Sequence, residues 1–466
     1  MQEQPKKIKP RLWEACLILL IMLVIMGIGI IGLHLTPVVP ILTIILLLIL
    51  WGRVRGFTWD DINDSFVIGV KNGIIPLFIF LLIGCLIGVW IMSGVIPTLM
   101  VYGFHILSVR WFLPSVFLMC AFVGFFIGSA FTIISTVGIA AMGIGITMGI
   151  NPAMIAGAVV SGAVFSDKMS PLSATTNLAS AIAGDDLYGH IKNMLWSTAP
   201  AFIISLILFA LIGGGHNSAN LAKITATTGI LTSHFTVSFW MLFPVLLLLI
   251  CAWTKIPTIP TLFINILVTI VMTLVTPHNP YSFVKIADVM QNGFTIKTAS
   301  PEVNQFLNRG GIISMTSTMT LIIMALALGG LLINLGVIDT VMDRFSSHIK
   351  SDGMLVLSTV LAAIGVNIFI GEEYLSIILP GTAFKKDFKK AGLAPEALGR
   401  ALEDGGAVIN YLVPWGVAGV FVANTLNVPT LHYLPFVFFS LLCPVFSILS
   451  GFTGIGLKRL NKTNEK

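Results

Sequence analysis

The segment FSDKMSPLSATT, Phe165–Thr176, combines one carboxylate, one amine and five hydroxyl groups between two apolar stretches. Pro171 lacks a backbone N–H and restricts Ser170 before it, so a helix that enters this segment should break there. A broken helix leaves unpaired carbonyls at the end of one half and unpaired amides at the start of the next. Carbonyl, hydroxyl and carboxylate oxygens suit a small, hard cation such as Na⁺. A carboxylate removed from water also holds a proton more tightly, so H⁺ and Na⁺ would compete for the same oxygens.

Polar side chains at membrane depth are costly, and they therefore mark candidate binding sites. The candidate cation and proton ligands are Asp167, Ser170, Ser173, Thr175, Thr176 and Asn177, together with Ser129, Thr132 and Thr136. Of these, Asp167, Ser173 and Thr176 would hold the Na⁺ ion. A second polar site comprises Glu372, Glu373, Glu403, Asp404 and Asn410. Arg400 is a candidate anion site.

Structural roles are the alternatives for several of these residues. Asp167 and Lys168 could form an ion pair, although neighbouring residues point about 100° apart on a helix. Arg400, Glu403 and Asp404 have the spacing of a set that neutralises itself along one helix. Single serines and threonines often only join packed helices.

Three residues near the end of the broken segment are interpreted as interfacial. Asp185 and Asp186 are expected to be solvated there. His190 follows them and could respond to pH, but a histidine at a membrane interface usually does not.

Composition sets the environment of all these groups. The 466 residues are 56% hydrophobic and 10% charged, with a mean hydropathy of +0.98, whereas a soluble protein carries roughly 25% charged residues. Apolar runs of about twenty residues recur, which predicts an all-α polytopic membrane protein. The apolar run 12–33 is too long for a signal peptide and is expected to be retained. The five scattered cysteines fit neither a disulfide framework nor a metal site.

The chain carries an internal repeat at an offset of 243 residues. GINPAMIAGAVVSGAVFSDKMSP, from Gly149, aligns without a gap on GLAPEALGRALEDGGAVINYLVP, from Gly392. In this register Gly128 meets Gly371, and Asp167 meets Asn410. One residue out of step, SGVIPTLM parallels LGVIDTVM. The matched prolines and glycines indicate a duplication.

Each half is expected to contain about five transmembrane helices, one re-entrant hairpin and a discontinuous helix. The N-terminal repeat, 1–214, has its hairpin at 112–148 and its broken helix at 152–183. Residues 215–235 form an external linker. The C-terminal repeat, 236–466, has its hairpin at 353–384 and its broken segment at 395–424. Because an odd number of crossings separates the repeats, the second should be inverted.

The distribution of positive charge supports this topology with both termini cytoplasmic. Most lysines and arginines, including the run KKDFKK at 385–390, then fall on the cytoplasmic side. The positive residues on the external side are Arg110, Lys223, Lys285, Lys297 and Arg309.

Nearly the whole chain resembles the NhaC-type Na⁺/H⁺ antiporters of the ion-transporter superfamily. The most specific segments are GSAFTIISTVGIAAMGIG, GAVVSGAVFSDKMSPLSATTNLA and DDLYGHIKNMLWSTAPAFIISLILF. The resemblance implies sodium extrusion driven by proton entry across a bacterial inner membrane, by a homodimer with elevator-type alternating access. It also covers malate/lactate sodium antiporters. The family commonly has SPLSDTTN, whereas Ala174 replaces the acidic residue here.

The leading function is therefore exchange of Na⁺, or alternatively Li⁺, for H⁺. The alternative is a sodium- and proton-coupled exchanger of organic acids such as malate and lactate. No cofactor or nucleic acid is expected. An intramembrane protease is disfavoured because the sequence has no His-Glu-x-x-His motif, and an inverted duplication favours alternating access over a passive channel.

Overall fold

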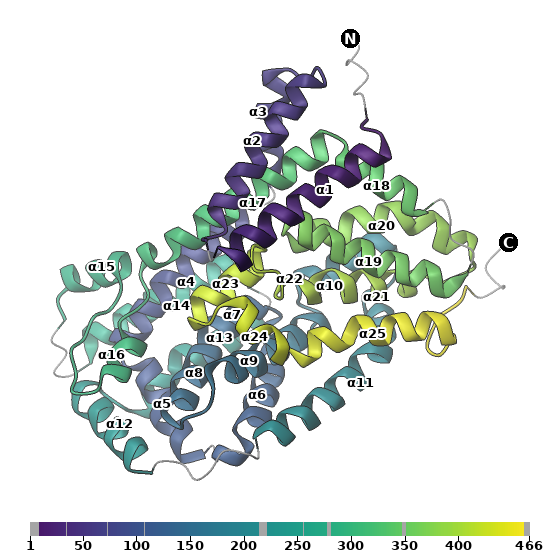
Figure 1. Ribbon diagram of the computed structural model, residues 1–466. Helices are drawn as coiled ribbons and strands as arrows, with labels where there is room; N and C mark the ends of the chain where they lie inside the picture. The colour runs from purple at the N-terminus through teal and green to yellow at the C-terminus, as the bar shows by residue number, and fades with distance from the viewer. Residues whose placement is uncertain are drawn as a thin grey trace.

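The computed structural model describes residues 9–33, 35–71, 73–106, 108–213, 221–254, 256–276, 281–346 and 351–460 (Figure 1). All named elements in these ranges are helices, and one isolated β-bridge pairs Leu393 with Arg459. The termini (with Lys6, Lys7, Lys462 and Lys466), Lys255, Lys350 and positions 215–220 of the predicted linker lie outside the described residues.

The first half of the chain forms eleven α-helices and three shorter helical turns. They are α1 (Leu12–Met26), η1 (Gly27–Gly32), α2 (Val38–Val54), α3 (Trp59–Lys71), α4 (Ile74–Met92), α5 (Val95–Ile106), η2 (Val109–Trp111), α6 (Phe112–Ile127), α7 (Ala130–Ile133), η3 (Ile134–Gly138), α8 (Ile139–Thr147), α9 (Pro152–Met169), α10 (Ala174–Ala183) and α11 (Leu187–Gly213).

The second half is also helical throughout its described residues. Its elements are α12 (Leu221–His234), η4 (Phe239–Leu242), α13 (Phe243–Trp253), α14 (Thr258–Val275), α15 (Phe283–Asn292), α16 (Pro301–Leu307), α17 (Ile312–Asn334), α18 (Val337–Ser346), α19 (Asp352–Ile370), α20 (Glu373–Lys390), α21 (Pro395–Gly405), α22 (Ala407–Asn410), α23 (Val417–Leu426), α24 (Thr430–Tyr433), η5 (Leu434–Phe436) and α25 (Phe438–Thr453).

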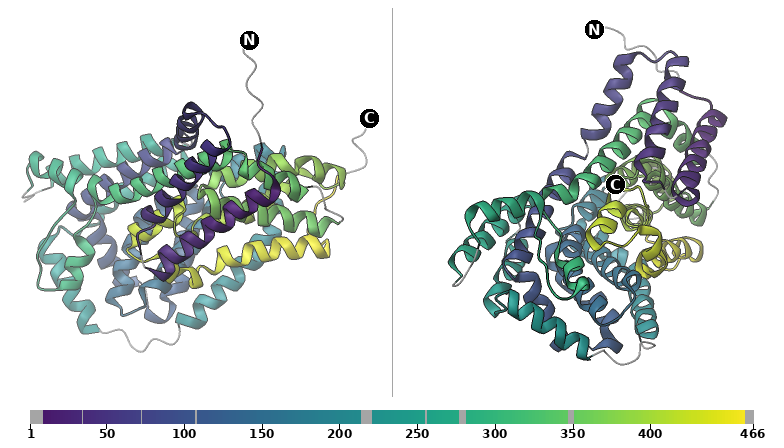
Figure 2. Two further views of the ribbon diagram at one scale, coloured as in Figure 1. Left: turned by 45° about the horizontal axis from the view of Figure 1, so that its top comes forward. Right: turned by 60° about the vertical axis from the view of Figure 1, so that its left-hand side comes forward.

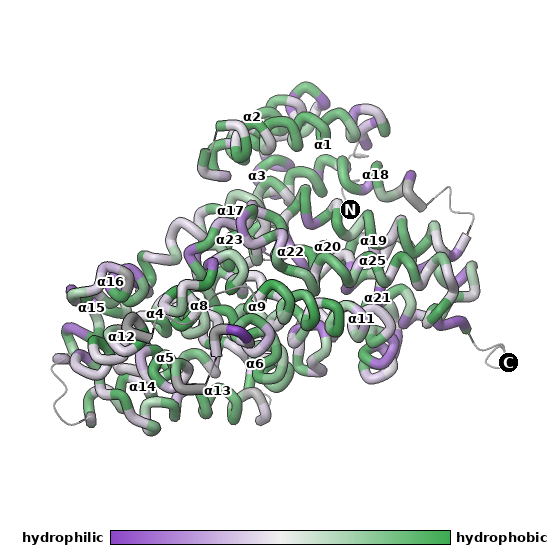
Figure 3. The backbone as a smooth tube through the Cα atoms, turned by 60° about the horizontal axis from the view of Figure 1, so that its bottom comes forward, coloured by the Kyte–Doolittle hydropathy of each residue, from purple (hydrophilic) through white to green (hydrophobic). Residues whose placement is uncertain are grey.

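Seven helices in the described ranges are long and apolar enough to cross a membrane, or nine if two bent pairs each count as one span. The seven are Leu12–Gly32, Ile74–Met92, Ala130–Thr147, Leu187–Gly213, Thr258–Val275, Ile312–Asn334 and Asp352–Ile370. Figure 3 shows hydrophobic residues along most of the helices. The prediction of an all-α polytopic membrane protein is confirmed, whereas the re-entrant hairpins and the inverted orientation of the halves stay predictions.

Matched helix ends support the duplication. α6 ends at Gly128 and α19 ends at Gly371, both in the left-handed region with φ of 69° and 77°. The next residue caps the following helix in both halves: Ser129 accepts from Thr132 N, and Glu372 accepts from Leu375 N. The offset of 243 residues therefore holds for backbone conformation as well as for sequence.

The same register holds at the second break of each half. Pro152 and Pro395 are each the first residue of a helix, as suits their missing N–H. α10 and α23 begin 243 positions apart, and they end at Gly184 and Asn427, both in the left-handed region. The halves differ afterwards, since α11 is continuous but its counterpart is bent by 59° between η5 and α25.

Several segments differ from their predicted bounds. The chain before Met92 is divided into two helices, α3 and α4, and Gly73 caps α4. Most of the predicted linker, 221–234, is α12, because its residues are mixed in polarity but contain no proline. The apolar helix α5 and the amphipathic helix α18 were not expected. They follow Gly94 and Gly336, both with positive φ.

Helices from the two halves pack together around the polar residues. α10 contacts α20 and α21, while α25 lies along α11, as Figures 1 and 2 both show. α1, α2 and α11 carry many exposed large hydrophobic side chains, such as Leu20, Leu46 and Leu211, and these faces suit contact with lipid.

Candidate functional site

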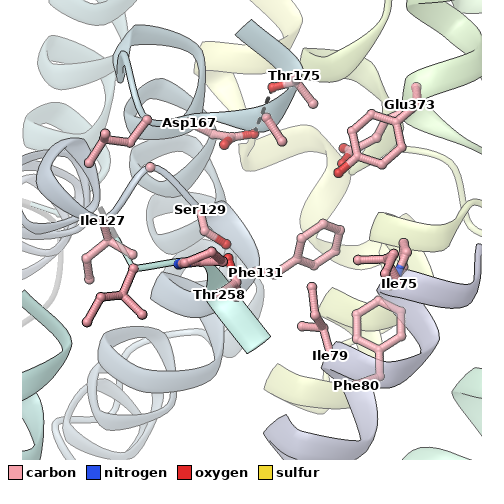
Figure 4. A pocket seen from close by; sticks show the side chains of 17 residues that line it. Ile75, Ile79, Phe80, Ile127, Ser129, Phe131, Asp167, Thr175, Thr258 and Glu373 are labelled. Atoms are coloured by element: carbon pink, nitrogen blue, oxygen red, sulfur yellow. Dashed lines mark hydrogen bonds between the residues drawn. The ribbon is translucent and has the colours of Figure 1, made fainter. Parts of the chain in front are cut away.

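A cavity of about 200 Å³ lies where the broken segments of both halves meet. Its walls come from the start of α4, the α6–α7 break, the α9–α10 break and the starts of α14 and α20. Asp167 and Glu373 both line it, and Figure 4 shows them near each other with Ser129 and Thr258 on the facing side. Two carboxyl groups from different halves of the chain therefore share one cavity.

The break that positions Asp167 follows from its local sequence. α9 ends at Met169, and Ser170 takes an extended conformation with ψ of 131° before Pro171. α10 then begins at Ala174 with Ser173 as its cap, whose hydroxyl accepts from Thr176 N. Asp167 therefore lies in the last turn of α9, directly before unwound backbone.

The carbonyls at the end of α9 are not free. Thr176 Oγ1 donates to the carbonyls of Asp167 and Lys168, at 3.2 and 3.1 Å. Thr176 is fully buried and does not line the cavity. In this conformation its hydroxyl completes the broken helix.

Hydroxyl groups surround the carboxylate of Asp167. Asp167 is 8% exposed, and its Oδ2 accepts from Thr175 Oγ1 at 3.3 Å. Thr175 also bonds Ser173 Oγ at 2.9 Å and lines the cavity itself. This arrangement offers a cation one carboxylate and an adjoining hydroxyl.

The neighbouring acids Glu372 and Glu373 have different environments. Glu372 accepts from Leu375 N at 2.8 Å as the cap of α20, and it does not line the cavity. Glu373 lines the cavity, is 5% exposed, and its Oε2 has no hydrogen-bond partner among the described atoms. Of these two glutamates, Glu373 is therefore the one that presents an unbonded carboxyl oxygen at the cavity.

Lys168 pairs with Asp404 rather than with Asp167. The two side chains, from α9 and α21, are 1% and 0% exposed, and Lys168 Nζ also donates to Ser197 Oγ at 3.1 Å. The alternative of an Asp167–Lys168 pair is wrong because the side chains of adjacent helical residues diverge. No lysine or arginine in the described part of the chain forms an ion pair with Asp167, so a proton or a bound cation would balance its charge.

Arg400 and its predicted helix partners do not bond one another. Arg400 donates to Gly456 O at 3.0 Å and to Ser450 Oγ at 2.7 Å, so the self-neutralising set is wrong. Arg400 is fully buried against the end of α25 and does not line the cavity of Asp167. Glu403, beside it, is also fully buried, and neither of its carboxyl oxygens has a hydrogen-bond partner among the described atoms.

Other candidates lie around the cavity without lining it. Ser170 accepts from Leu172 N, Thr136 donates to Thr132 O, and Asn177 donates to Pro171 O and Ser173 O. Thr132 donates to Ser129 Oγ and lines a smaller neighbouring cavity of about 30 Å³.

Asn410, the repeat counterpart of Asp167, bonds with other residues of its own half. It donates to Asn367 Oδ1 at 2.7 Å and accepts from Ala418 N at 2.9 Å. Asn410 is fully buried and does not line the cavity.

The expectation that the Asp185 side chain is solvated is wrong. Its side chain is 1% exposed, and Asp185 Oδ2 lies 3.0 Å from Nδ1 of the fully buried His190. Gly399 of α21 covers the ring, since a Cβ at that position would lie within about 2.5 Å of His190 Nδ1. The close approach of a neighbouring helix buries the pair, and sequence spacing does not reveal that approach.

Sequence reasoning missed the remaining walls of the cavity. These are contributed by Ile75, Pro76, Ile79, Phe80, Phe131, Tyr374 and the segment 256–258. Pro76 and Pro257, near the starts of α4 and α14, were the only features of the sequence that could have pointed to these walls. Ala174 also lines the cavity, so the position where the resemblance expects an acid contributes only a methyl group here.

The donor set suits a weakly held alkali cation better than a transition metal. Among the described residues, no group of three or more histidine, cysteine, aspartate or glutamate side chains could hold a metal ion. The oxygens that face the cavity are two carboxylates and a few hydroxyls, which are hard ligands.

Comparison with known proteins places these features in context. The model of the Na⁺/H⁺ antiporter family matches residues 162–455. The Na⁺/H⁺ antiporter NhaC of Alkalihalophilus pseudofirmus is 44% identical over 412 residues, covering 88% of this chain and 89% of the relative. NhaC of Bacillus subtilis is 39% identical, with 85% and 88% covered. The malate-2H⁺/Na⁺-lactate antiporter of Bacillus subtilis is 34% identical, with 88% and 87% covered.

Proposed function

Since this chain belongs to the Na⁺/H⁺ antiporter family, we propose that it exchanges Na⁺ for H⁺ across the bacterial inner membrane. One observation carries the assignment to a site: Asp167 and Glu373 line the same cavity from two broken segments, and no described cation pairs with either. Li⁺ is the alternative cation.

Exchange follows from competition at these carboxyl groups. With Na⁺ absent, a desolvated carboxylic acid keeps its proton. When Na⁺ enters, the O–H bond breaks, the electron pair stays on the oxygen, and the proton leaves to the water on the same side. Thr175 and Ser129 supply hydroxyl oxygens beside the bound ion, because both line the cavity. On the other side of the membrane a proton binds the carboxylate oxygen again and Na⁺ leaves.

Alternating access would expose the cavity to each side in turn. The broken segments of α6–α10 and α19–α23 form the proposed moving body, and a homodimer supplies the scaffold, as the resemblance implies. Both termini are proposed to be cytoplasmic, which agrees with the distribution of positive charge.

Exchange of an organic acid is the second candidate. A relative 34% identical to this chain is a malate-2H⁺/Na⁺-lactate antiporter. Ala174 replaces an acid in the cavity wall, which leaves more room and less negative charge for an anionic cargo.

The proposal is tested with purified protein in proteoliposomes that contain a pH dye. Addition of Na⁺, Li⁺, K⁺, malate and lactate in turn should give proton movement with Na⁺, and with Li⁺ if it is accepted. A response to neither cation would refute Na⁺/H⁺ exchange. A response to malate or lactate that depends on a Na⁺ gradient would establish the second candidate.

A further inference from the structure

A second cavity, of about 180 Å³, lies between α5, α8, α16 and the end of α23, and it shares no lining residue with the cavity of Asp167. Arg309 lines it from the loop that joins α16 to α17. Its guanidinium lies over the ring of Phe306, 5.0 Å from the centroid, and its Nη1 donates to Thr425 O at 3.2 Å. These two contacts fix the direction of the side chain.

Arg309 is a partly buried cation without an acidic partner in the described part of the chain. Burial lowers the pKa of Arg309 to about 10, so the group is still positively charged at neutral pH. A guanidinium has five N–H donors, and the carbonyl of Thr425 occupies one of them. A partly desolvated charge interacts more strongly with an opposite charge than a fully solvated one does, and an anion in the cavity would supply that opposite charge.

Arg309 has an evident structural role as well, which explains only part of this arrangement. Thr425 lies in the last turn of α23, and a cation near a helix C-terminus is favourable. Capping the end of α23 in this way needs one N–H donor of the guanidinium and no cavity beside it. It does not account for the space beside the guanidinium or for its other donors.

The walls of the cavity select among anions. Apart from Arg309, the polar side chains that line it are Gln305, Asn427 and Thr147, and Thr147 is committed to Gly143 O. The other walls are mainly apolar, with Met100, Met142, Ile146 and Leu426 among them. One guanidinium opposite apolar walls suits a single carboxylate with a short carbon chain. Inorganic phosphate would need more positive charge, and a halide would leave the apolar walls without contacts.

We propose that the Arg309 cavity is a binding site for a small organic carboxylate, held in a bidentate pair by the guanidinium. The carboxyl group would lie against Arg309, and its carbon chain would lie against the methionines of α5 and α8. The inference deepens the proposed function and rests on it for its role in transport, where the site would select an organic-acid cargo. The predicted topology places this site at the external face.

Equilibrium binding to the purified full-length chain tests the site directly. Radiolabelled lactate and malate are the probes, with acetate, chloride and inorganic phosphate as competitors. The variants are Arg309→Gln and Arg309→Lys, with Arg110→Gln as the control, because Arg110 is an exposed arginine on the same predicted face. Elution as a single species and an unchanged melting temperature show that each variant is folded.

We expect saturable binding that Arg309→Gln weakens at least tenfold, that Arg309→Lys weakens less, and that Arg110→Gln leaves unchanged. Acetate should displace the probe at lower concentration than chloride or phosphate. The site is refuted if Arg309→Gln binds as well as the parent, if neither acid binds, or if chloride or phosphate displaces the probe as well as acetate. Loss of Na⁺/H⁺ exchange with binding retained would count against the proposed function and leave the site standing.

Discussion

Lys168 and Asp404 form a buried ion pair although 236 positions separate them in the chain. The pair joins α9 of the first half to α21 of the second. It lies next to Asp167 in sequence, yet it leaves Asp167 free to face the cavity. The positive charge closest in sequence to the proposed cation site is therefore already neutralised.

Replacing one member of this pair should destabilise the protein more than replacing both members with apolar residues. Asp404→Leu or Lys168→Met alone leaves a buried charge without its partner, which costs about 3–5 kcal/mol. The double variant Lys168→Met/Asp404→Leu should be closer to the parent. Unfolding in mixed micelles measures the free energies, and Lys390→Ala, which removes an exposed pair with Asp387, should change them by about 0–1 kcal/mol. Additive losses in the double variant would contradict the coupling.

Asp167→Asn should abolish Na⁺-induced proton movement in vesicles, while the protein still inserts into the membrane. The amide keeps the size and polarity of the side chain, but it cannot exchange a proton for Na⁺. The control is Asp387→Asn on α20, whose partner is the exposed Lys390. Undiminished exchange in Asp167→Asn would remove this residue from the mechanism.

The two adjacent glutamates should respond differently. Glu373→Gln should impair exchange and leave stability nearly unchanged, because its Oε2 has no bond to lose. Glu372→Ala removes the cap of α20 and should cost about 0.5–2 kcal/mol. Exchange assays and unfolding curves on both variants check this division. The opposite pattern would show that Glu372 is the ligand.

Substitutions of two threonines in the predicted cation site should also differ in their effect, here on the KM for Na⁺. Thr175→Val removes a hydroxyl that lines the cavity and bonds Asp167, so the KM for Na⁺ should rise about 3- to 10-fold, equivalent to ~0.5–1.5 kcal/mol for one hydrogen bond. Thr136→Val removes a hydroxyl bonded to Thr132 O outside the cavity. Its KM should match the parent, and an equal rise in both variants would indicate a general loss of packing.

The left-handed glycine before Glu372 should be sensitive to substitution. Gly371 has φ of +77°, and a Cβ there would lie 3.2 Å from Gly416 Cα. Gly371→Ala should cost about 1–2 kcal/mol and reduce exchange by displacing the start of α20. Gly365→Ala is the matched control, since no atom lies within 4 Å of its added Cβ. Thermal unfolding of the two variants gives the comparison.

The sequence predicted local features better than contacts between distant segments. Pro171 and the glycines at 128 and 371 mark breaks because proline and left-handed backbone act within a few residues. The partner of Lys168, the burial of Asp185 with His190 and the bonds of Arg400 depend on which helices meet. Residue spacing along one helix carries no information on that.

The cavity was predicted in part for the same reason. Asp167, Thr175 and Glu373 stand out as polar residues in apolar segments, and all three line it. Its apolar walls in α4 and α14 resemble any other membrane-spanning sequence. Thr136 and Asn177 show the converse: they are polar and close in sequence to the breaks, but their bonds go to backbone carbonyls.

Asn410 is neutral and hydrogen-bonded within its own half, whereas its counterpart Asp167 lines the cavity. The two copies of the duplicated unit therefore differ in chemistry at this position. At this repeat position the N-terminal copy has the ionisable Asp167, whereas the C-terminal copy has an amide that bonds Asn367 and Ala418 of the same copy. Swapping the pair, as Asp167→Asn with Asn410→Asp, would move the negative charge away from the cavity that Glu373 lines, and ion exchange should not return. The two copies thus keep matching backbone breaks, but they no longer have the same side-chain chemistry at those breaks.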